Sequence, residues 1–321
     1  MKLLSFIVFL VLQIAFLPLA VVGFVLVAYK QMVISKRLGV SQTAIEVLNG
    51  RWTMHVFGMR EDEATDRLAE AVPNTSPLGL WLVLFPVWVK YKISGSYFGY
   101  PRIPEEGAEG MADLVIARTF YFDRILERAA PEMEQFVLLG AGYDTRAYGM
   151  LKRPGLAIYE VDQKRIQEHK VASLADGGIE ASHVTFVPVD FSKDDAFEEL
   201  QKAGYDPEKK TMFIWEGVTL YLAEADVRRT LADIRDHSAR GSVVAVDLYD
   251  EDFVKLGKNA AAKKTLAYTN EGFDFGLPLA TDYEGVLKRF AESEKLEVGE
   301  TFFMRKKSPK GPFVVVAELI V

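Results

Sequence analysis

Residues 136–149 read FVLLGAGYDTRAYG: four apolar residues lead directly into Gly-Ala-Gly, and an acid and a hydroxyl follow soon after. A short apolar run that ends in glycines is typical of a buried strand that turns into a helix at the edge of a sheet. Glycines at this place let the backbone approach a ligand closely, because no side chain stands in the way. The stretch therefore predicts a ligand site at the end of the first strand.

Further short apolar segments follow, separated by segments with helical periodicity. Together with the first strand, QFVLLG (135–140), these segments are LAIYEVD (156–162), VTFVPVD (184–190), TMFIWEG (211–217) and SVVAVDL (242–248). They are apolar throughout rather than alternating, which is typical of parallel strands covered on both faces. Near the C-terminus, ETFFMRK (300–306) and FVVVAELIV (313–321) are joined by the turn-forming KSPKG, which predicts an antiparallel hairpin. We predict an α/β fold with a doubly wound, mostly parallel sheet of about seven strands and this hairpin at its end.

The three strands after the glycines each deliver an acid. Asp162 ends the second strand 20 residues beyond Gly142, the position from which a carboxylate reaches ribose hydroxyls. Asp190 ends the third strand and Glu216 the fourth. One such acid can be a helix cap, but three beside a glycine loop favour a ligand rich in hydrogen-bond donors and positive charge. S-adenosylmethionine has these groups and carries no phosphate.

A dinucleotide is the alternative ligand. Its fingerprint, G-x-G-x-x-G, requires a third glycine at position 145, where this chain has Thr145. This difference disfavours NAD or FAD without excluding them, so a nicotinamide-dependent oxidoreductase on a Rossmann-like fold stays open. We expect Asp144 or Thr145 to cap the helix that follows the loop.

A charged residue interrupts the apolar stripe of the helix predicted in MADLVIARTFYFDRILERAA (111–130). The stripe consists of Met111, Leu114, Val115, Phe122, Ile125, Leu126 and Ala129, and Arg118 falls on the same face. A guanidinium on an inward face must meet an anion, because an unpaired buried charge is very costly. The anion is either an acid of the chain or a group of the ligand.

Composition excludes several classes of protein. The 321-residue chain has no cysteine, which rules out disulfides and thiolate metal sites, and none of its four histidines pair at i, i+4, so no metal site is predicted. A formal net charge of −7 argues against a general nucleic-acid binder.

The N-terminus is apolar enough for a membrane. Leu3–Ala28 carries no charge and only Ser5 and Gln13 as polar side chains. Its 26 residues form a helix of about 39 Å, longer than a hydrocarbon core of about 30 Å. A core helix would have a polar face and a signal peptide a shorter apolar region, so we expect residues 1–30 to be a retained transmembrane anchor.

A second apolar patch, LGLWLVLFPVWV (78–89), has tryptophans and is followed by Lys90 and Lys92. Twelve residues are too few to span a bilayer but suit its interface, and a hydrophobic lid or core segment is an equal alternative. We therefore predict a linker over 31–107, with an interfacial or second membrane segment near 78–97, and a catalytic domain over 108–321. Lys30, Lys36 and Arg37 place this domain in the cytosol whether the chain crosses once or twice.

Four ordered segments resemble the motifs of the leucine carboxyl methyltransferase family, a class I S-adenosylmethionine-dependent group: VLLGAGYDTRAY, YEVDQKRIQEHK, VPVDFSKDDAFEEL and FIWEGVTLYL. The resemblance covers about residues 108–321. It implies that Arg118 binds the methionine carboxylate of the cofactor and that Gly140 and Gly142 line its methionine moiety. It further implies that Asp162 holds the ribose, Asp190 and Phe191 contact adenine, and Glu216 approaches the amino-acid portion. Lys164 and Phe191 depart from the usual proline and leucine of the family and bear on the adenine pocket.

The methyl acceptor is less defined. We expect O-methylation of a carboxylate or hydroxyl on a small or lipophilic acceptor at the cytosolic membrane face, because two apolar segments precede the domain. A membrane-anchored, non-catalytic cofactor-binding protein is a further alternative. Candidates for a general base near the strand ends are Asp247, Tyr249, Tyr221 and His237, and each has an equally good structural explanation. By resemblance, residues 270–278 form a loop over the substrate side.

Overall fold

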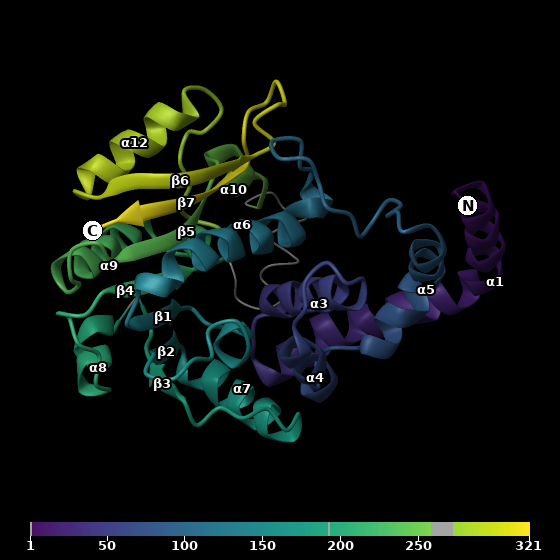
Figure 1. Cartoon of the computed structure of the whole chain (residues 1–321), viewed down its shortest axis with the longest axis horizontal. Helices are drawn as coiled ribbons and strands as arrows, with labels where there is room; N and C mark the ends of the chain where they lie inside the picture. The colour runs from purple at the N-terminus through teal and green to yellow at the C-terminus, as the bar shows by residue number, and fades with distance from the viewer. Residues whose placement is uncertain (1, 192, 258–271) are drawn as a thin grey trace.

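The computed structural model describes residues 2–191, 193–257 and 272–321. Within these ranges a seven-stranded sheet forms the centre of the molecule, with helices on both faces (Figure 1). Its strands are β1 (Gln135–Leu139), β2 (Ala157–Asp162), β3 (Val184–Pro188), β4 (Thr211–Trp215), β5 (Val243–Tyr249), β6 (Glu297–Met304) and β7 (Val314–Ile320). They lie in the order β3-β2-β1-β4-β5-β7-β6.

The strand directions confirm the predicted fold class. β1 to β5 pair in parallel, whereas β7 is antiparallel to both β5 and β6. β7 therefore lies between β5 and β6, and the C-terminal hairpin closes the sheet at the β6 edge. The order reverses between β1 and β4, which is where open α/β sheets bind ligands, beyond the carboxyl ends of the strands.

The apolar strands divide their side chains between two cores. Phe136 and Leu138 of β1 join the core on one face of the sheet, whereas Val137 and Leu139 join the core on the other face. Alternate residues of a strand point to opposite faces, so a strand covered on both faces must be apolar at every position. This explains why the strands show no alternation in the sequence.

The helices of the sheet-containing region follow the predicted spacers. They are α6 (Leu114–Ala129), α7 (Lys164–Asp176), α8 (Ala196–Lys202), α9 (Glu224–Asp236), α10 (Glu251–Gly257) and α12 (Tyr283–Ser293). A single 3-10 turn, Met111–Asp113, precedes α6, in which Asp113 accepts the backbone N–H of Gly110. The glycine loop after β1 leads only into the short 3-10 helix Arg146–Tyr148 rather than into an α-helix.

Residues 2–94 are largely helical. They form α1 (Lys2–Ala28), a π-helical turn (Tyr29–Ile34), α2 (Ser35–Leu38), α3 (Gln42–Val56), α4 (Glu63–Ala71) and α5 (Pro77–Ser94). The second apolar patch forms α5, which lies beside α1 and runs antiparallel to it (Figure 1). α3 contacts α6 and α4 contacts α7, so the segment expected as a linker covers part of the sheet-containing region.

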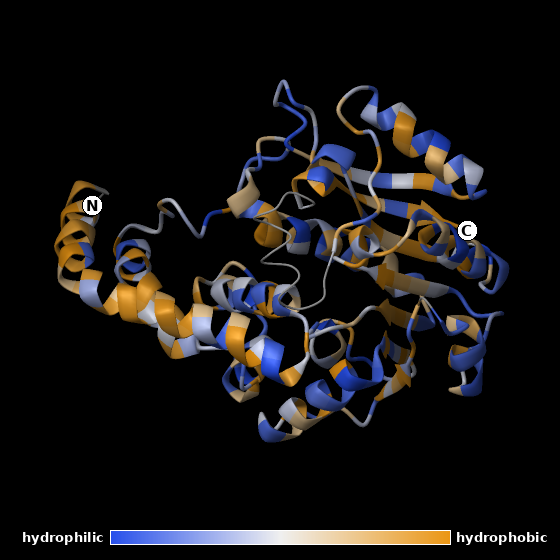
Figure 2. Ribbon diagram, turned by 180° about the vertical axis from the view of Figure 1, so that it is seen from behind, coloured by the Kyte–Doolittle hydropathy of each residue, from blue (hydrophilic) through white to orange (hydrophobic). Residues whose placement is uncertain are grey.

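Among the described residues, one helical stretch is long and apolar enough to cross a membrane. It runs over Leu3–Leu38, with a hydropathy of 2.7 in its most apolar window, of which 6% is buried. Figure 2 shows this stretch as a long hydrophobic helix at one end of the molecule.

Candidate cofactor and acceptor cavity

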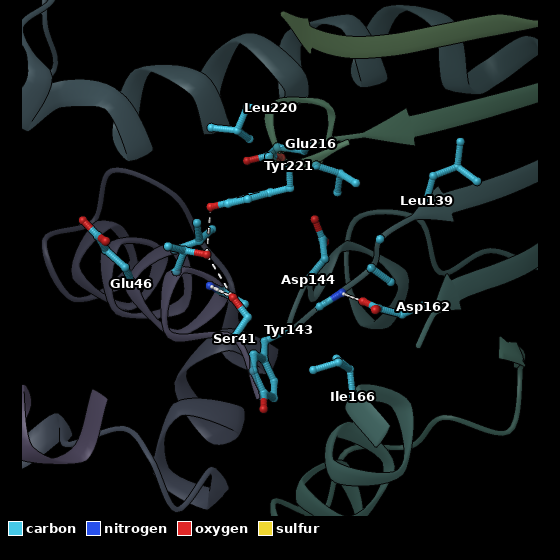
Figure 3. Close-up of a pocket in the computed structure, with 18 of the residues that line it drawn as sticks. Ser41, Glu46, Leu139, Tyr143, Asp144, Asp162, Ile166, Glu216, Leu220 and Tyr221 are labelled. Atoms are coloured by element: carbon cyan, nitrogen blue, oxygen red, sulfur yellow. Dashed lines mark hydrogen bonds between the residues drawn. The ribbon is translucent and has the colours of Figure 1, made fainter. Parts of the chain in front are cut away.

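One cavity of about 1120 Å³ lies at the carboxyl ends of the parallel strands (Figure 3). All seven residues expected at a cofactor site line it: Arg118, Gly140, Gly142, Asp162, Asp190, Phe191 and Glu216. Single-ligand pockets are typically about 300–1,000 Å³, so this cavity has room for a cofactor and for part of a second molecule. The fold thus brings together residues that lie up to about a hundred positions apart in the chain.

The glycine loop forms the floor of the cavity. Gly140 has φ +68°, and a Cβ there would lie 2.4 Å from Cγ2 of Val218. Gly142 has φ +45° and donates its N–H to Oδ2 of Asp162 over 2.7 Å. Both residues occupy the left-handed region that disfavours side chains, and Gly140 in addition has no space for one.

Asp162 is fixed by the backbone at the end of β2. Besides the Gly142 N–H it accepts the N–H of its neighbour Gln163 over 2.7 Å. Burial raises the pKa of Asp162 above its usual value, and these two hydrogen bonds lower it by less. Each carboxylate oxygen can accept more than one hydrogen bond, so Asp162 keeps capacity for a ligand hydroxyl.

The next strand end carries Asp190 and Phe191. Asp190 accepts the ammonium of Lys193 at 2.5 Å, and its own N–H donates to Asp194. The carbonyl of Phe191 accepts Nη2 of Arg229 over 2.6 Å. The backbone around Phe191 is therefore held from α9 while its side chain lines the cavity.

Glu216 lies at the centre of a buried charge network. Its Oε1 accepts Nε of Arg118 at 3.1 Å, and its Oε2 accepts Nη2 of Arg51 at 2.8 Å and Nη1 of Arg146 at 2.7 Å. Burial raises the pKa of Glu216, but the three guanidiniums outweigh burial and lower that pKa to about 2. Glu216 is therefore ionised at neutral pH.

Arg118 meets its anions within the chain. Besides Glu216, its Nη1 contacts Oδ2 of Asp247 at 3.1 Å and the hydroxyl of Tyr249 at 2.6 Å. The predicted anion on the inward face of the helix is thus supplied by acids at the ends of β4 and β5. Arg118 also lines the cavity, and its role toward a cofactor stays a prediction.

Sequence reasoning missed Arg51. This side chain of α3 bonds Glu216 and, through Nη1, Oδ2 of Asp144 at 2.8 Å. Asp144 also accepts Arg146 through its backbone N–H and its guanidinium, and both arginines hold the pKa of Asp144 well below its usual range despite burial. The available signal was an arginine beside the stripe of Ile45, Leu48 and Trp52, the same kind of signal that identified Arg118.

Thr145 does not cap a helix. Its hydroxyl donates to Oδ2 of Asp62 over 2.7 Å and lies 2.7 Å from the hydroxyl of Thr65. Both partners belong to the start of α4, where Asp62 is the N-cap. The residue that replaces the third glycine of a dinucleotide fingerprint therefore ties the loop to the N-terminal helices.

The side of the cavity away from Asp162 is aromatic. Tyr221, Tyr249, Phe253 and Phe273 line it and contact one another, with ring centroids 5.4–5.8 Å apart. We call these four residues the aromatic wall. Phe273 belongs to the loop expected over 270–278, of which 270 and 271 lie outside the described residues.

Glu46 is an acid of the cavity lining whose side chain is exposed to solvent. It projects from α3 and lines the same cavity (Figure 3). In the described part of the chain its carboxylate makes no hydrogen bond or ion pair. Desolvation raises the pKa of Glu46 above its usual value, and the charge of Arg118 lowers it by less.

The four residues expected as candidate general bases each contact another residue of the chain. Asp247 pairs with Arg118, and Tyr249 donates its hydroxyl to Asp247 over 2.7 Å. The hydroxyl of Tyr221 donates to Thr43 of α3 over 3.0 Å. His237 is exposed at the C-terminal end of α9, where it stacks on Phe197, and it does not line the cavity.

Comparisons with known proteins agree with this geometry. Residues 91–235 match the family described as leucine carboxyl methyltransferase, which confirms the resemblance seen in the sequence motifs. A protein of Saccharopolyspora erythraea named "Putative S-adenosyl-L-methionine-dependent methyltransferase" is 35% identical over 159 residues, covering 46% of this chain and 54% of its own length. A protein of the same name from Mycobacteroides abscessus is 34% identical over 176 residues, covering 53% of this chain and 56% of its own length. The chain thus matches little more than half the length of these relatives.

Solved structures show weaker similarity. A TehB-like SAM-dependent methyltransferase from Corynebacterium glutamicum has a TM-score of 0.38 at 18% identity, over 61% of this chain and 85% of its own. The glycopeptide N-methyltransferase MtfA in complex with S-adenosyl-L-methionine has a TM-score of 0.41 at 15% identity, over 70% and 99%. These similarities are too low to inform the site.

The network around Glu216 predicts a large loss of stability when Arg51 is removed. Arg51→Met leaves Glu216 and Asp144 with one buried partner fewer, and breaking a buried ion pair costs about 3–5 kcal/mol. Arg67→Met is the matched control, because Arg67 makes an exposed pair with Glu63 that contributes less than about 1 kcal/mol. Urea unfolding of the full chain in detergent measures both; equal losses in the two variants would contradict the structural role of Arg51.

Proposed function

We propose that this chain, which matches the leucine carboxyl methyltransferase family over residues 91–235, is an S-adenosylmethionine-dependent methyltransferase. The observation that carries the proposal is the joint lining of one cavity by the glycine loop and the strand-end acids Asp162, Asp190 and Glu216. Acids at successive strand ends suit a ligand with ribose hydroxyls, an amine and a net positive charge. They repel the phosphates of a dinucleotide.

The residues present fit such a cofactor from end to end. Asp162 would accept the ribose hydroxyls, and Asp190 with Phe191 would contact adenine. The backbone of Gly140 and Gly142 would approach the methionine moiety, which the positive φ angles and absent side chains allow.

The two charged residues at the other end would hold the amino-acid portion. Glu216 is ionised and suits the ammonium group, and the guanidinium of Arg118 suits the carboxylate. Since both already pair with each other, the cofactor would join an existing network instead of meeting isolated buried charges.

Bound S-adenosylmethionine supplies an electrophilic methyl group on a positively charged sulfur, and its transfer is an in-line displacement. The chain then contributes positioning, exclusion of water and a proton acceptor. The aromatic wall provides an apolar surface for the acceptor, and Glu46 provides the proton acceptor.

Of the expected acceptors, a hydroxyl on a lipophilic molecule fits this half of the cavity better than a carboxylate. A hydroxyl loses its proton as its oxygen bonds the methyl carbon, and the unpaired Glu46 carboxylate can take that proton. A carboxylate acceptor needs no base and would meet the negative charge of Glu46. The Glu46 side chain lines the cavity and is exposed to solvent, so a proton that it takes up can pass on to water. Partial desolvation raises its pKa above the usual glutamate value, which favours proton uptake.

The two alternative functions are less well supported. An oxidoreductase would place a pyrophosphate on the loop where Asp144 and the Thr145–Asp62 pair lie. A non-catalytic binding protein would hold the cofactor in the same cavity but transfer no methyl group. Methyl-transfer activity with any acceptor excludes the latter.

We further propose that the protein is attached to the membrane through its apolar N-terminal helix, with the catalytic domain in the cytosol. The helix has no charge between Leu3 and Ala28, and Lys30, Lys36 and Arg37 follow it. If the acceptor is dissolved in the bilayer, this attachment brings the enzyme to its substrate.

Cofactor binding is tested with Asp162→Asn. The amide cannot accept two ribose hydroxyls as the carboxylate does, so S-adenosylmethionine should bind more weakly by about 1.5–3 kcal/mol. Asp236→Asn, at the exposed end of α9, is the control and should bind like the wild type. Calorimetric titration measures both, with thermal unfolding to verify folding; unchanged affinity in Asp162→Asn would sink the assignment.

The role of Glu46 is tested with Glu46→Gln. In the wild type, methyl transfer should rise with pH as Glu46 loses its proton, through a pKa that burial raises above the usual glutamate value. The glutamine cannot accept a proton, so this limb of the pH profile should vanish and kcat should fall by about 10²–10⁴.

The measurement uses transfer of a labelled methyl group to a panel of phenols, long-chain alcohols and fatty acids. Glu70→Gln, an exposed acid on neighbouring α4, should retain the wild-type profile. Equal affinity of Glu46→Gln for S-adenosylmethionine separates a catalytic from a binding defect. A wild-type pH profile in Glu46→Gln, or preference for carboxylic acids, would refute the base.

A further inference from the structure

The apolar helix α1 is fastened to the rest of the chain along most of its length. Phe6 and Phe9 contact Phe98, with ring centroids 5.6 and 5.2 Å apart. In the middle, Phe16 stacks on Phe85 at 4.9 Å. Beyond α1, the ammonium of Lys30 donates to the carbonyl of Pro73 over 2.7 Å. Residues 73–98 therefore run antiparallel to residues 6–30 and contact them along this length.

Two glycines bring α1 and α5 into backbone contact. A Cβ on Gly23 would lie 2.5 Å from the carbonyl oxygen of Gly79, and one on Gly79 would lie 2.8 Å from that of Gly23. Small residues at facing positions allow helices to approach this closely. α1 and α5 are therefore closely packed against each other.

The opposite side of α5 rests on α3 and the residue that follows it. Trp81 meets Trp52 of α3 edge to face at 5.8 Å, and Nε1 of Trp88 donates to the carbonyl of Val56 over 3.3 Å. One turn further, Tyr91 lies 5.9 Å from Phe57. α5 is therefore sandwiched between α1 and α3, from its first turns almost to its end.

This packing is incompatible with α1 crossing the bilayer. If α1 crossed, α5 would cross beside it, and Tyr91 would lie about 18 Å deeper than Gly79, at 1.5 Å per residue. Phe57 would then be carried into the hydrocarbon together with the ion pairs of Arg60 with Asp62 and Asp123. Charged groups at that depth are very costly. In addition, α3 would enter the bilayer with Arg51, which pairs with Glu216 in the cavity.

The outer face of α1 nevertheless requires an apolar environment. Its exposed side chains are all apolar: Leu3, Leu4, Phe6, Ile7, Leu10, Val11, Ile14, Leu17, Leu19, Val21, Val22, Phe24 and Val25. This is a far larger apolar surface than soluble monomers leave in water. Between Leu3 and Ala28 this face has no exposed polar or charged side chain that would fix the register of a protein partner. Basic residues follow at the end of the helix, as suits an anionic lipid surface.

We infer that α1 does not span the membrane but lies within one leaflet, with its outer face among the acyl chains and its inner face on α5. Such in-plane helices normally need a polar face toward water. Here the inner face meets apolar α5 instead, which explains why α1 is apolar all round. The inference rests on the proposed membrane attachment and replaces the expected one or two crossings; it does not depend on the methyl-transfer chemistry.

This orientation brings the cavity to the membrane surface. The helix that starts as α1 continues through the π-helical turn into α2, and Lys36 and Gly39 at its end line the cavity. A lipophilic acceptor would reach the aromatic wall from the same leaflet that holds α1.

The chain lacks cysteine, so single cysteines on the full-length protein can carry a nitroxide at chosen places. Leu4→Cys, Ile14→Cys and Val25→Cys sample the exposed face of α1, and Lys202→Cys on α8 is the water-exposed control. The protein is reconstituted into phosphatidylcholine–phosphatidylglycerol vesicles. Oxygen and nickel-chelate accessibility then gives the depth of each label, and ascorbate added outside gives its side.

All three α1 labels should lie no deeper than about 15 Å below the membrane surface on the side where Lys202→Cys is exposed to water. This depth is half of a hydrocarbon core of about 30 Å. The Leu4→Cys label should be reduced from the same side as the Lys202→Cys label. A Leu4→Cys label at the opposite surface would show a crossing and overturn the inference. No vesicle binding, or spin coupling between copies in a soluble dimer, would overturn it in favour of a second chain.

S-adenosylmethionine affinity is measured on the same variants. Retained affinity with a crossing α1 would refute only the orientation. Lost affinity in every variant and in the unlabelled wild type would instead refute the proposed function.

Discussion

The carboxylate of Glu216 is the interaction on which the site depends. It accepts guanidinium groups from three separate parts of the chain: Arg51 of α3, Arg118 of α6 and Arg146 of the glycine loop. All three arginines have a second acid, Asp144 for Arg51 and Arg146 and Asp247 for Arg118, so each buried charge has opposite charges around it. Because a buried charge is tolerated only when it is paired, these elements must assemble together. The end of β4, the first strand past the reversal of the sheet, is thereby joined to the N-terminal helices.

The same network connects the apolar helix α1 with the cavity. α3 carries Arg51 into the network and Trp52 onto α5, which in turn carries α1. The hydroxyl of Thr145 ties α4 to the glycine loop. On one side, α3 therefore forms part of the cavity wall. On its other side, α3 packs on α5, which supports the apolar helix α1.

The sequence predicted the features that depend on local pattern. Buried strands had to be apolar at every position, the glycine loop needed residues without side chains, and strand ends of a parallel sheet had to gather at one edge. For this reason Asp162, Asp190 and Glu216 were found, and they line one cavity with Gly140 and Gly142. The antiparallel C-terminal hairpin followed from its short turn.

Contacts between distant segments left no such pattern. Arg51 is 165 residues from Glu216, and nothing near either residue in the sequence indicates the other. Glu46 could not be separated from surface acids, because it is itself exposed and only the fold brings it into the lining of the cavity. The packing of α1 depends on Gly23, Gly79 and Trp81 together, which length and hydropathy alone do not indicate.

The central claim is that the cavity holds S-adenosylmethionine in a preformed acidic site, and the most direct measurement is calorimetric titration of the full-length wild type in detergent. Titrations with S-adenosylmethionine, NADH and NADPH are compared under the same conditions. We predict one molecule of S-adenosylmethionine bound per chain and no heat from either dinucleotide. Binding of NADH or NADPH with no binding of S-adenosylmethionine would contradict the account.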